Sequence, residues 1–163
     1  MTETQVFAAL DRLGDLFGAQ PGWWLFDPEA TDPPPHTVTV YDGPVVSGET
    51  GDGVAVGVSE PGSQATAAVP VSRSGPNGLG PSDQESWRIG CGISVIVGDG
   101  DHRQTRARLG ALFSQCSAAI RADMTLGGTV MHVRIGDWSM WQLASPRGSE
   151  LYLHFDVVGF SQL

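Results

Sequence analysis

The residues best suited to chemistry gather in one turn, Gly98-Asp99-Gly100-Asp101-His102. Its two carboxylates and its imidazole are groups that bind divalent cations. The spacing does not fit a calcium-binding EF-hand loop, because Arg103 and Leu112 stand where such a loop needs ligands. Asp101 followed three residues later by Gln104 is typical of a helix N-cap. We therefore predict a turn and a capped helix here, and no bound metal ion.

The remaining histidines and the cysteines give no stronger candidate. His132 and His154 fall on neighbouring predicted strands, but two imidazoles without a third ligand make a poor zinc site. Cys91 and Cys116 occupy apolar positions of predicted elements, where buried free thiols are common; a disulfide between them is the lesser alternative. The segment Gly90-Cys91-Gly92 lacks the third glycine of a dinucleotide-binding fingerprint, so its glycines predict close packing against a neighbouring backbone.

Enzyme motifs are missing from the sequence. All nine basic residues are arginine, which excludes a P-loop lysine and a Schiff base. Neither a Gly-x-Ser-x-Gly elbow nor a His-Glu-x-x-His motif occurs. We expect a protein that is not an enzyme and has no catalytic residue and no cofactor.

Charge is distributed unevenly along the chain. Residues 1–60 hold ten acidic residues and one arginine, whereas residues 61–163 hold eight of each, and the net charge is −9. Duplex DNA binding needs a clustered basic surface, so we expect no sequence-specific nucleic-acid partner. No segment is apolar enough for a membrane span or a signal peptide, and we expect folding in a cytoplasm.

Three arginines, Arg103, Arg106 and Arg108, crowd the start of the predicted helix, where the helix dipole disfavours positive charge. One interpretation is a solvated face paired with Asp99 and Asp101. The other is a subunit contact with the acid-rich N-terminal third of a second copy. Opposite charges on two faces of one protomer favour head-to-tail rings.

The elements that position these residues follow from apolar spacing. One strand is predicted by strict alternation at Trp87, Ile89, Cys91, Ile93, Val95 and Val97. A helix from Asp101 is predicted by apolar residues at Leu109, Leu112, Phe113, Cys116 and Ile120. An N-terminal helix ending at Gly18 is predicted by Val6, Leu10, Leu13 and Phe17.

Further strands are predicted on both sides of the central helix. Residues 37–41 and 54–58 indicate an antiparallel pair, and a weaker strand is indicated at 65–71. After the helix, strands are predicted at 129–135, 138–143 and 150–160, the last two forming a hairpin. The fold class expected for residues 1–163 is therefore a single α+β domain, a mostly antiparallel sheet packed against two helices.

Two segments do not fit regular elements. Residues 20–36 form a Trp- and Pro-rich arm that holds Trp23 and Trp24 and either covers its own core or docks on a neighbouring subunit. Residues 72–84 are rich in glycine, serine and proline and predict a flexible loop.

This order of elements resembles the tail terminator family of long-tailed phages, whose members include minor tail protein U-like proteins. The resemblance covers most of the chain and is carried by the helix from Asp101 and by three strand segments, which are Val38-Thr39-Val40-Tyr41-Asp42-Gly43-Pro44, Glu85-Ser86-Trp87-Arg88-Ile89 and Leu153-His154-Phe155-Asp156-Val157-Val158-Gly159. The Pro-rich arm and the loop after Val71 depart from the family.

The resemblance implies a structural virion protein, assembled in the host bacterial cytoplasm. Its protomers would form a hexameric ring that caps the tail tube, stops tube polymerisation and presents a surface to the head-tail connector, while DNA passes through the lumen. Under it we expect Arg103, Arg106, Trp23 and Trp24 at subunit contacts. The loop residues Ser72, Arg73, Asn77 and Gly78 are expected to face the tube or the lumen.

Two other functions stay open at this point. A neck or head-tail adaptor protein would also form a ring but would bind the connector instead of the tube. A small ligand-binding domain or enzyme would use a pocket between the arm and the sheet, lined by Trp23, Trp24 and His36.

Overall fold

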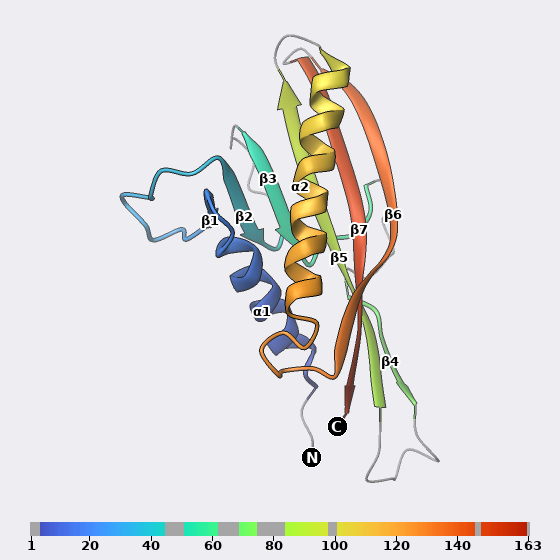
Figure 1. Cartoon of the computed structure of the whole chain (residues 1–163). Coiled ribbons are helices and arrows are strands. Elements are labelled where there is room, and N and C mark those ends of the chain that lie inside the picture. The colour runs from blue at the N-terminus through green and yellow to red at the C-terminus, as the bar shows by residue number, and fades with distance from the viewer. Residues whose placement is uncertain are drawn as a thin grey trace.

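The computed structural model describes residues 4–44, 51–61, 69–74, 84–97, 101–145 and 148–162. They form one seven-stranded sheet and two helices (Figure 1). In chain order the elements are α1 (Val6–Gly18), β1 (Trp23–Leu25), β2 (Val38–Asp42), β3 (Asp52–Val56), β4 (Val71–Ser74), β5 (Gln84–Val97), α2 (His102–Ala122), β6 (His132–Ser145) and β7 (Gly148–Gln162). The predicted α+β class with two helices in a single domain is confirmed.

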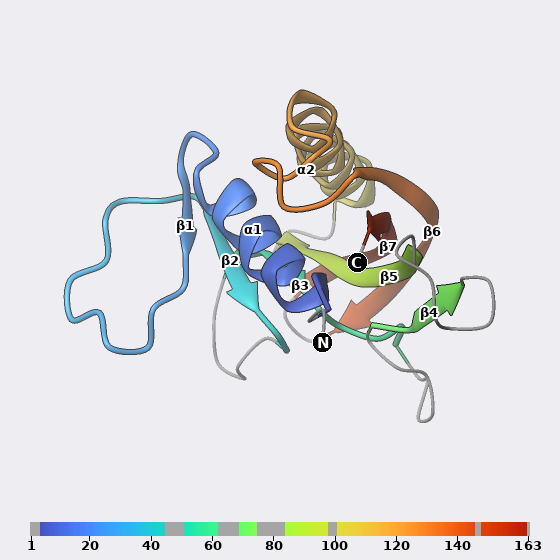
Figure 2. The same ribbon diagram turned by 90° about the horizontal axis from the view of Figure 1, so that it is seen from below.

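Both helices cover the same face of the sheet, as Figures 1 and 2 show. The core lies between these two layers, and the predicted apolar stripes face it. The fully buried side chains of this core include Leu13, Phe17, Cys116, Ile89, Ile93 and Phe155. Burial of each large apolar side chain contributes about 2 kcal/mol, so the stripes read from the sequence are what holds helices and sheet together.

Both predicted helix ends are close to those observed. The backbone N–H of Gln104 donates to Asp101 Oδ1 at 3.1 Å, which confirms the predicted N-cap of α2. Helix α1 ends at Gly18, where a side chain is excluded because a Cβ would lie 2.7 Å from the Cβ of Leu25 in β1. Gly18 therefore allows the close approach of α1 to β1, a role different from the C-terminal cap that the sequence suggested.

The sheet is mixed, with strand order β1-β2-β3-β5-β7-β6 and β4 beside β5. The predicted antiparallel pairing of residues 37–41 with 54–58 is wrong, because β2 and β3 are parallel with Val38 opposite Asp52. Alternating valines specify a strand and its buried face but not its direction. Residues 43–51 are numerous enough to return the chain along a five-residue strand, so both directions were open.

Strand β6 replaces two predicted strands. The segments at 129–135 and 138–143 belong to one strand, whose register against β7 shifts between Ile135 and Trp138. Gly136 and Asp137 therefore form a bulge within one strand, where the sequence analysis predicted a break between two strands. The predicted hairpin with the last strand is confirmed, since pairing of β6 with β7 extends to Ser145 opposite Gly148.

The loop predicted at 72–84 is wrong at both of its ends. Ser72 and Arg73 lie in β4, where they pair with Ser86 and Glu85 of β5, and β5 already begins at Gln84. A short run with little apolar character is held here by pairing with β5, which residue composition does not reveal. Residues 75–83, with Asn77 and Gly78, lie outside the described residues, as do residues 65–68 of the weaker strand predicted at 65–71.

The Trp- and Pro-rich arm contains the edge strand β1, which pairs in parallel with β2. Trp23 faces the helices and is buried in the protein's own core. Trp24 points to the opposite face of the sheet, where it is only partly buried. Of the two interpretations of the arm, the one in which it covers its own core therefore holds for Trp23.

Candidate functional site: the seam between α2 and β6

One edge of the sheet is formed by the long strand β6. It is fourteen residues long and lies last in the strand order, with β7 as its partner. Its outer side therefore presents backbone N–H and C=O groups that no strand of the described residues pairs. Long, unprotected edges are templates for pairing with another chain.

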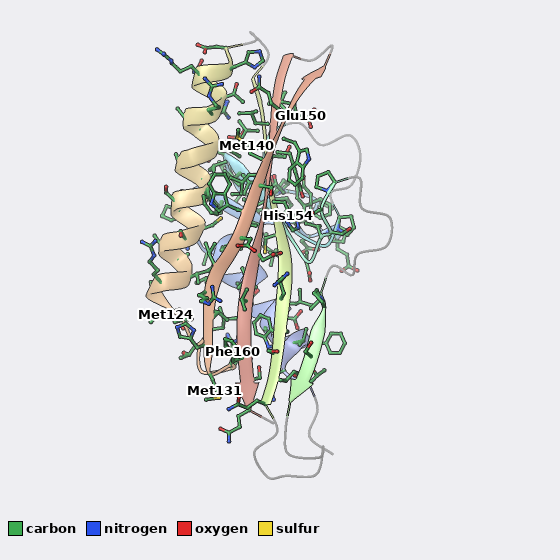
Figure 3. The ribbon with its side chains drawn as sticks, turned by 90° about the vertical axis from the view of Figure 1, so that its right-hand side faces the viewer. Met124, Met131, Met140, Glu150, His154 and Phe160 are labelled. Carbon is green, nitrogen blue, oxygen red and sulfur yellow. The ribbon has the colours of Figure 1, made fainter. Side chains whose placement is uncertain are left out.

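Large apolar side chains are exposed along this edge. Trp138 is 56% exposed and Met140, on the same face of the strand, is 42% exposed. The ring of Phe113 in α2 lies with its centroid 5.7 Å from that of Trp138 and 5.3 Å from that of buried Phe155. Phe113 thus links an exposed tryptophan to the core. We call the strip formed by His102, Arg106, Phe113, Trp138, Met140 and Gln142 the α2/β6 seam, and exposed Arg103 adjoins it in the first turn of α2. Figure 3 looks onto this edge, with Met140 labelled.

The upper end of the α2/β6 seam is polar. Gln142 Nε2 lies 3.3 Å from His102 Nδ1, which joins the end of β6 to the first turn of α2. Arg106 is exposed, and because it precedes Phe113 by two helical turns it lies on the same side of α2. Neither Arg106 nor exposed Arg103 forms an ion pair within the described part of the chain.

Arg108 does not belong to this surface. Its Nη2 donates to Asp52 Oδ2 at 2.5 Å on the other flank of α2, where Asp52 is 8% exposed. The predicted trio of basic residues is therefore split, since Arg108 has an intramolecular partner and the two others face solvent. Only Arg103 and Arg106 remain available to a second molecule.

The opposite edge of the sheet carries the arm. Residues 27–35, between β1 and β2, are exposed throughout and extend away from the body in Figures 1 and 2. The base of the arm is fixed by the rings of Trp24 and His36, whose centroids are 5.0 Å apart, and by Phe26 packed on Tyr41. The backbone N–H of Glu29 donates to Asp27 Oδ1 at 2.9 Å, a local turn within the arm.

A second exposed apolar area lies at the other end of α2. It consists of Met124, Met131 and Phe160, which we call the end patch (Figure 3). The backbone N–H of Met131 donates to the Phe160 carbonyl at 2.9 Å, which joins the residue before β6 to the end of β7. Beside it is a cavity of about 180 Å³ lined by Ser117, Ile120, Arg121, Met124, Val133, Arg134 and Ile135. Exposed apolar areas of this kind mark protein contacts.

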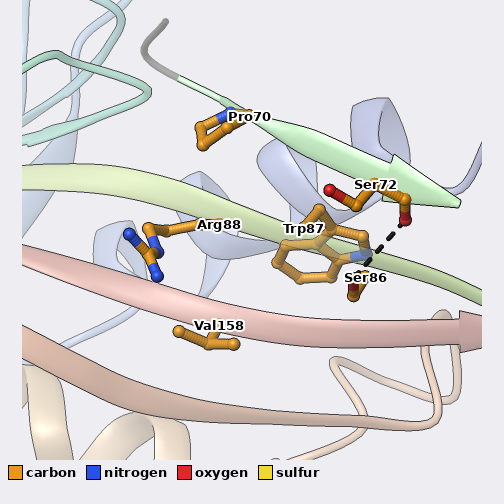
Figure 4. Close-up of a pocket in the computed structure, with 6 residues that line it drawn as sticks. All are labelled: Pro70, Ser72, Ser86, Trp87, Arg88 and Val158. Carbon is orange, nitrogen blue, oxygen red and sulfur yellow. Dashed lines mark hydrogen bonds between the residues drawn. The ribbon is translucent and has the colours of Figure 1, made fainter. Parts of the chain in front are cut away.

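A groove lies on the face of the sheet that the helices leave open (Figure 4). It has a volume of about 290 Å³ and is lined by Pro70, Ser72, Ser86, Trp87, Arg88 and Val158. The Ser86 hydroxyl donates to the Ser72 carbonyl at 3.4 Å, and Arg88 Nε lies 3.7 Å from Asp156 Oδ2. Burial raises the pKa of Asp156, while His154 and Arg88 oppose this rise. The Arg88 guanidinium, the cationic group of this groove, thus already faces the Asp156 carboxylate.

The two histidines considered for a metal do not meet. His132 is exposed and pairs with Phe160, whereas His154 is buried and pairs with Ser139, farther along the hairpin. A ring nitrogen of His154 is 3.1 Å from the Val58 carbonyl oxygen. Among the residues that the structure describes, no three His, Cys, Asp or Glu side chains group as metal ligands do. Residues 98–100 of the candidate turn lie outside that part of the chain.

Both cysteines are buried free thiols, as expected. Burial raises the pKa of Cys91 well above its ordinary value, and it raises the pKa of Cys116 to about 12. Both therefore stay protonated and unreactive at neutral pH. They belong to the core between β5 and α2.

Glycines at two positions of β5 permit close contacts on the open face, and the predicted contact with a neighbouring backbone is confirmed for Gly90, whereas Gly92 lies against a side chain. A Cβ at Gly90 would lie 2.0 Å from the Val58 carbonyl oxygen, and one at Gly92 would lie 2.2 Å from the Tyr152 hydroxyl. The segment after β3 crosses the sheet at Gly90 for this reason. It covers part of a face that would otherwise be open.

No protein-family model matches the sequence, and no curated protein matches it. Neither helix is both long enough and apolar enough to span a membrane, as far as the described residues go.

Sequence reasoning did not single out Trp138, Met140 or Phe113 as surface residues. A signal was present, because residues 138–141 place tryptophan or methionine on both faces of one predicted strand. Trp138 and Met140 lie on the face that the helices cover, yet both are exposed at the edge strand β6. Apolar residues on both faces of an edge strand therefore indicate a contact with something outside the domain.

Proposed function

We propose that this protein is a structural, ring-forming component of a phage tail, namely a tail terminator. In this role copies of the chain form a hexameric ring on the end of the tail tube and stop its polymerisation. The ring then offers a joining surface to the head-tail connector. It is assembled in the host bacterial cytoplasm and stays in the virion.

The observation that carries the proposal is the contrast between the two edges of the sheet. β6 at one edge is long and apolar and lies beside the arginines of α2, whereas β1 at the other edge carries an exposed acidic arm. Surfaces that differ but complement each other make head-to-tail contacts, which close into rings when the rotation between copies allows it. A ring protomer needs such a pair of surfaces.

The end patch supports the second part of the proposal. Met124, Met131 and Phe160 lie at one end of α2 and of the hairpin, away from the upper end of the α2/β6 seam (Figure 3). A ring built through the sheet edges leaves the ends of the protomer free for stacking. We assign the end patch to contact with the tail tube protein, which such a cap must bind.

Tails assembled with and without this protein test the function. In electron micrographs, we expect tails of uniform length when the protein is present and overlong, variable tubes when it is absent. Tails of normal length that fail to join heads would instead identify a neck adaptor. Tubes whose length and joining are both unaffected by its absence would refute the structural role.

A matched pair of variants distinguishes a specific role of the end patch from the general effect of an added surface charge. Met131→Glu places a charge in the patch, and Ala111→Glu places the same charge on the exposed outer side of α2. We expect overlong tubes with Met131→Glu only. Equal behaviour of the two variants would refute the assignment of the end patch to the tube.

A further inference from the structure

Charge on α2 is of one sign. The helix contains four arginines and no acidic residue, in a chain whose net charge is −9. Arg103 and Arg106 lie in its first turns, where the positive end of the helix dipole adds to their charge. Asp101 precedes α2 and Asp137 lies in β6, but no ion pair joins either carboxylate to Arg103 or Arg106 in the described part of the chain. An acidic partner would relieve this unfavourable concentration of charge.

The arm has the complementary character. Residues 20–36 contain three acidic residues, Asp27, Glu29 and Asp32, and no arginine. All three are exposed, on a segment whose base is fixed by Trp24 and His36. The arm is thus a preorganised acidic segment that makes few contacts with its own body. Fixing its base lowers the entropy cost of binding.

The apolar parts of the two surfaces also match. The arm ends in Pro33, Pro34 and Pro35, which favour the extended polyproline conformation. Proline-rich segments bind to grooves lined by aromatic rings. Phe113 and Trp138 supply two such rings at the α2/β6 seam, beside the exposed edge of β6. The arm therefore carries prolines for the two aromatic rings and carboxylates for the arginines in one segment.

One chain cannot make this contact with itself. The arm lies beside β1 and the α2/β6 seam lies beside β6, which are the first and last strands of the sheet order (Figure 1). We propose that the α2/β6 seam binds the Pro-rich, acidic arm of a second copy of this chain, with the prolines against Phe113 and Trp138 and the carboxylates toward Arg103 and Arg106. This inference rests on the proposed ring function and names the contact that builds the ring.

Charge reversal on both sides tests the contact in the full chain. The seam variant is Arg103→Glu with Arg106→Glu, and the arm variant is Glu29→Arg with Asp32→Arg. Glutamate in the first turns of α2 is favoured by the helix dipole, so the seam variant keeps its fold. The control is Arg12→Glu, a reversal at an exposed residue of α1. Self-association is measured by sedimentation equilibrium at low and high salt, and folding by circular dichroism.

We expect the wild type to associate, and to do so more weakly at high salt. Each double reversal should raise the apparent Kd of self-association by about tenfold or more at low salt. The chain with all four reversals regains association, because the two new arginines of the arm again face residues of opposite charge, the two new glutamates of α2. Arg12→Glu associates as the wild type does. Recovery in the fourfold variant separates the proposed pairing from simple damage.

Three results overturn the inference. If the wild type associates and both double reversals leave its Kd unchanged, the ring uses other surfaces, and the proposed function still stands. If the fourfold variant stays dissociated, the arm and the seam do not pair. If the wild type is monomeric at every concentration, no second copy binds the seam, and the tail experiment alone decides the function.

Discussion

Arg108 of α2 and Asp52 of β3 form an ion pair with an Nη2–Oδ2 distance of 2.5 Å across the boundary between helix and sheet. Asp52 is buried, and its other oxygen, Oδ1, has no hydrogen-bond partner in the described structure. Among the described residues, only the Arg108 guanidinium, which is about half exposed, forms an ion pair with this carboxylate. A buried carboxylate that loses its partner is strongly unfavourable.

Arg108→Met should accordingly destabilise the protein by about 2 kcal/mol, measured as the free energy of unfolding in urea. Adding Asp52→Asn should recover part of this loss, because the charge that needs a partner is then gone. The control Arg106→Met should change stability by less than about 0.5 kcal/mol, since Arg106 faces solvent. Equal losses in Arg108→Met and Arg106→Met would contradict a role for the pair.

Two glycines should respond to alanine in opposite directions. Gly90→Ala places a methyl group 2.0 Å from the Val58 carbonyl oxygen, so the crossing segment must move. We expect a loss of more than about 2 kcal/mol. Gly110→Ala, on the exposed side of α2 with nothing within 4 Å, should gain about 0.5 to 1 kcal/mol through helix propensity. Thermal unfolding of both variants checks this. A Gly90→Ala protein as stable as the wild type would show that the segment at Val58 can move away from β5 without loss of stability.

Residue spacing predicted the elements that are strongly periodic. The alternation from Trp87 to Val97, the cap at Asp101 and the stripe of α1 were all read correctly, because each is a local pattern set by packing against one core. Strand direction was not predictable, since the parallel pairing of β2 with β3 depends on the path of residues 43–51. Neither was β4, whose residues gain their place only by pairing with β5.

The candidate site was predictable in part. Arg103 and Arg106 were singled out from their unfavourable place at a helix start, and the structure leaves both exposed. Arg108 looked equivalent in sequence, and only the fold brings Asp52 to it. Trp138 was predicted only as the start of a strand, and the sequence did not show that this strand forms the edge of the sheet. The order of strands is a property of the whole chain.

The thiols should be unreactive in the folded protein. Cys91 and Cys116 are buried, and the pKa of each is raised by burial, to about 12 for Cys116. At pH 8 we expect a thiol-specific disulfide reagent to modify neither residue on the time scale of minutes, and to modify both in denaturant. Cys91→Ala and Cys116→Ala, one at a time, assign any reaction that does occur. Rapid modification of the native chain would contradict their place in the core.

Asp156 should make stability depend on pH. Burial raises its pKa above the ordinary value of 3.8, so protonation favours the folded state. This contribution is complete below pH 3.8 and is lost as the pH rises through the raised pKa of the folded protein. Asp156→Asn should therefore match the wild type in acid and exceed it at pH 7, by less than about 1 kcal/mol. Urea unfolding at both pH values measures this difference. In an Arg88→Met background, Asp156→Asn should gain more stability at pH 7, because the favourable contact between Arg88 and Asp156 is then absent. A less stable Asp156→Asn protein at pH 7 would mean that attraction by Arg88 and His154 outweighs burial.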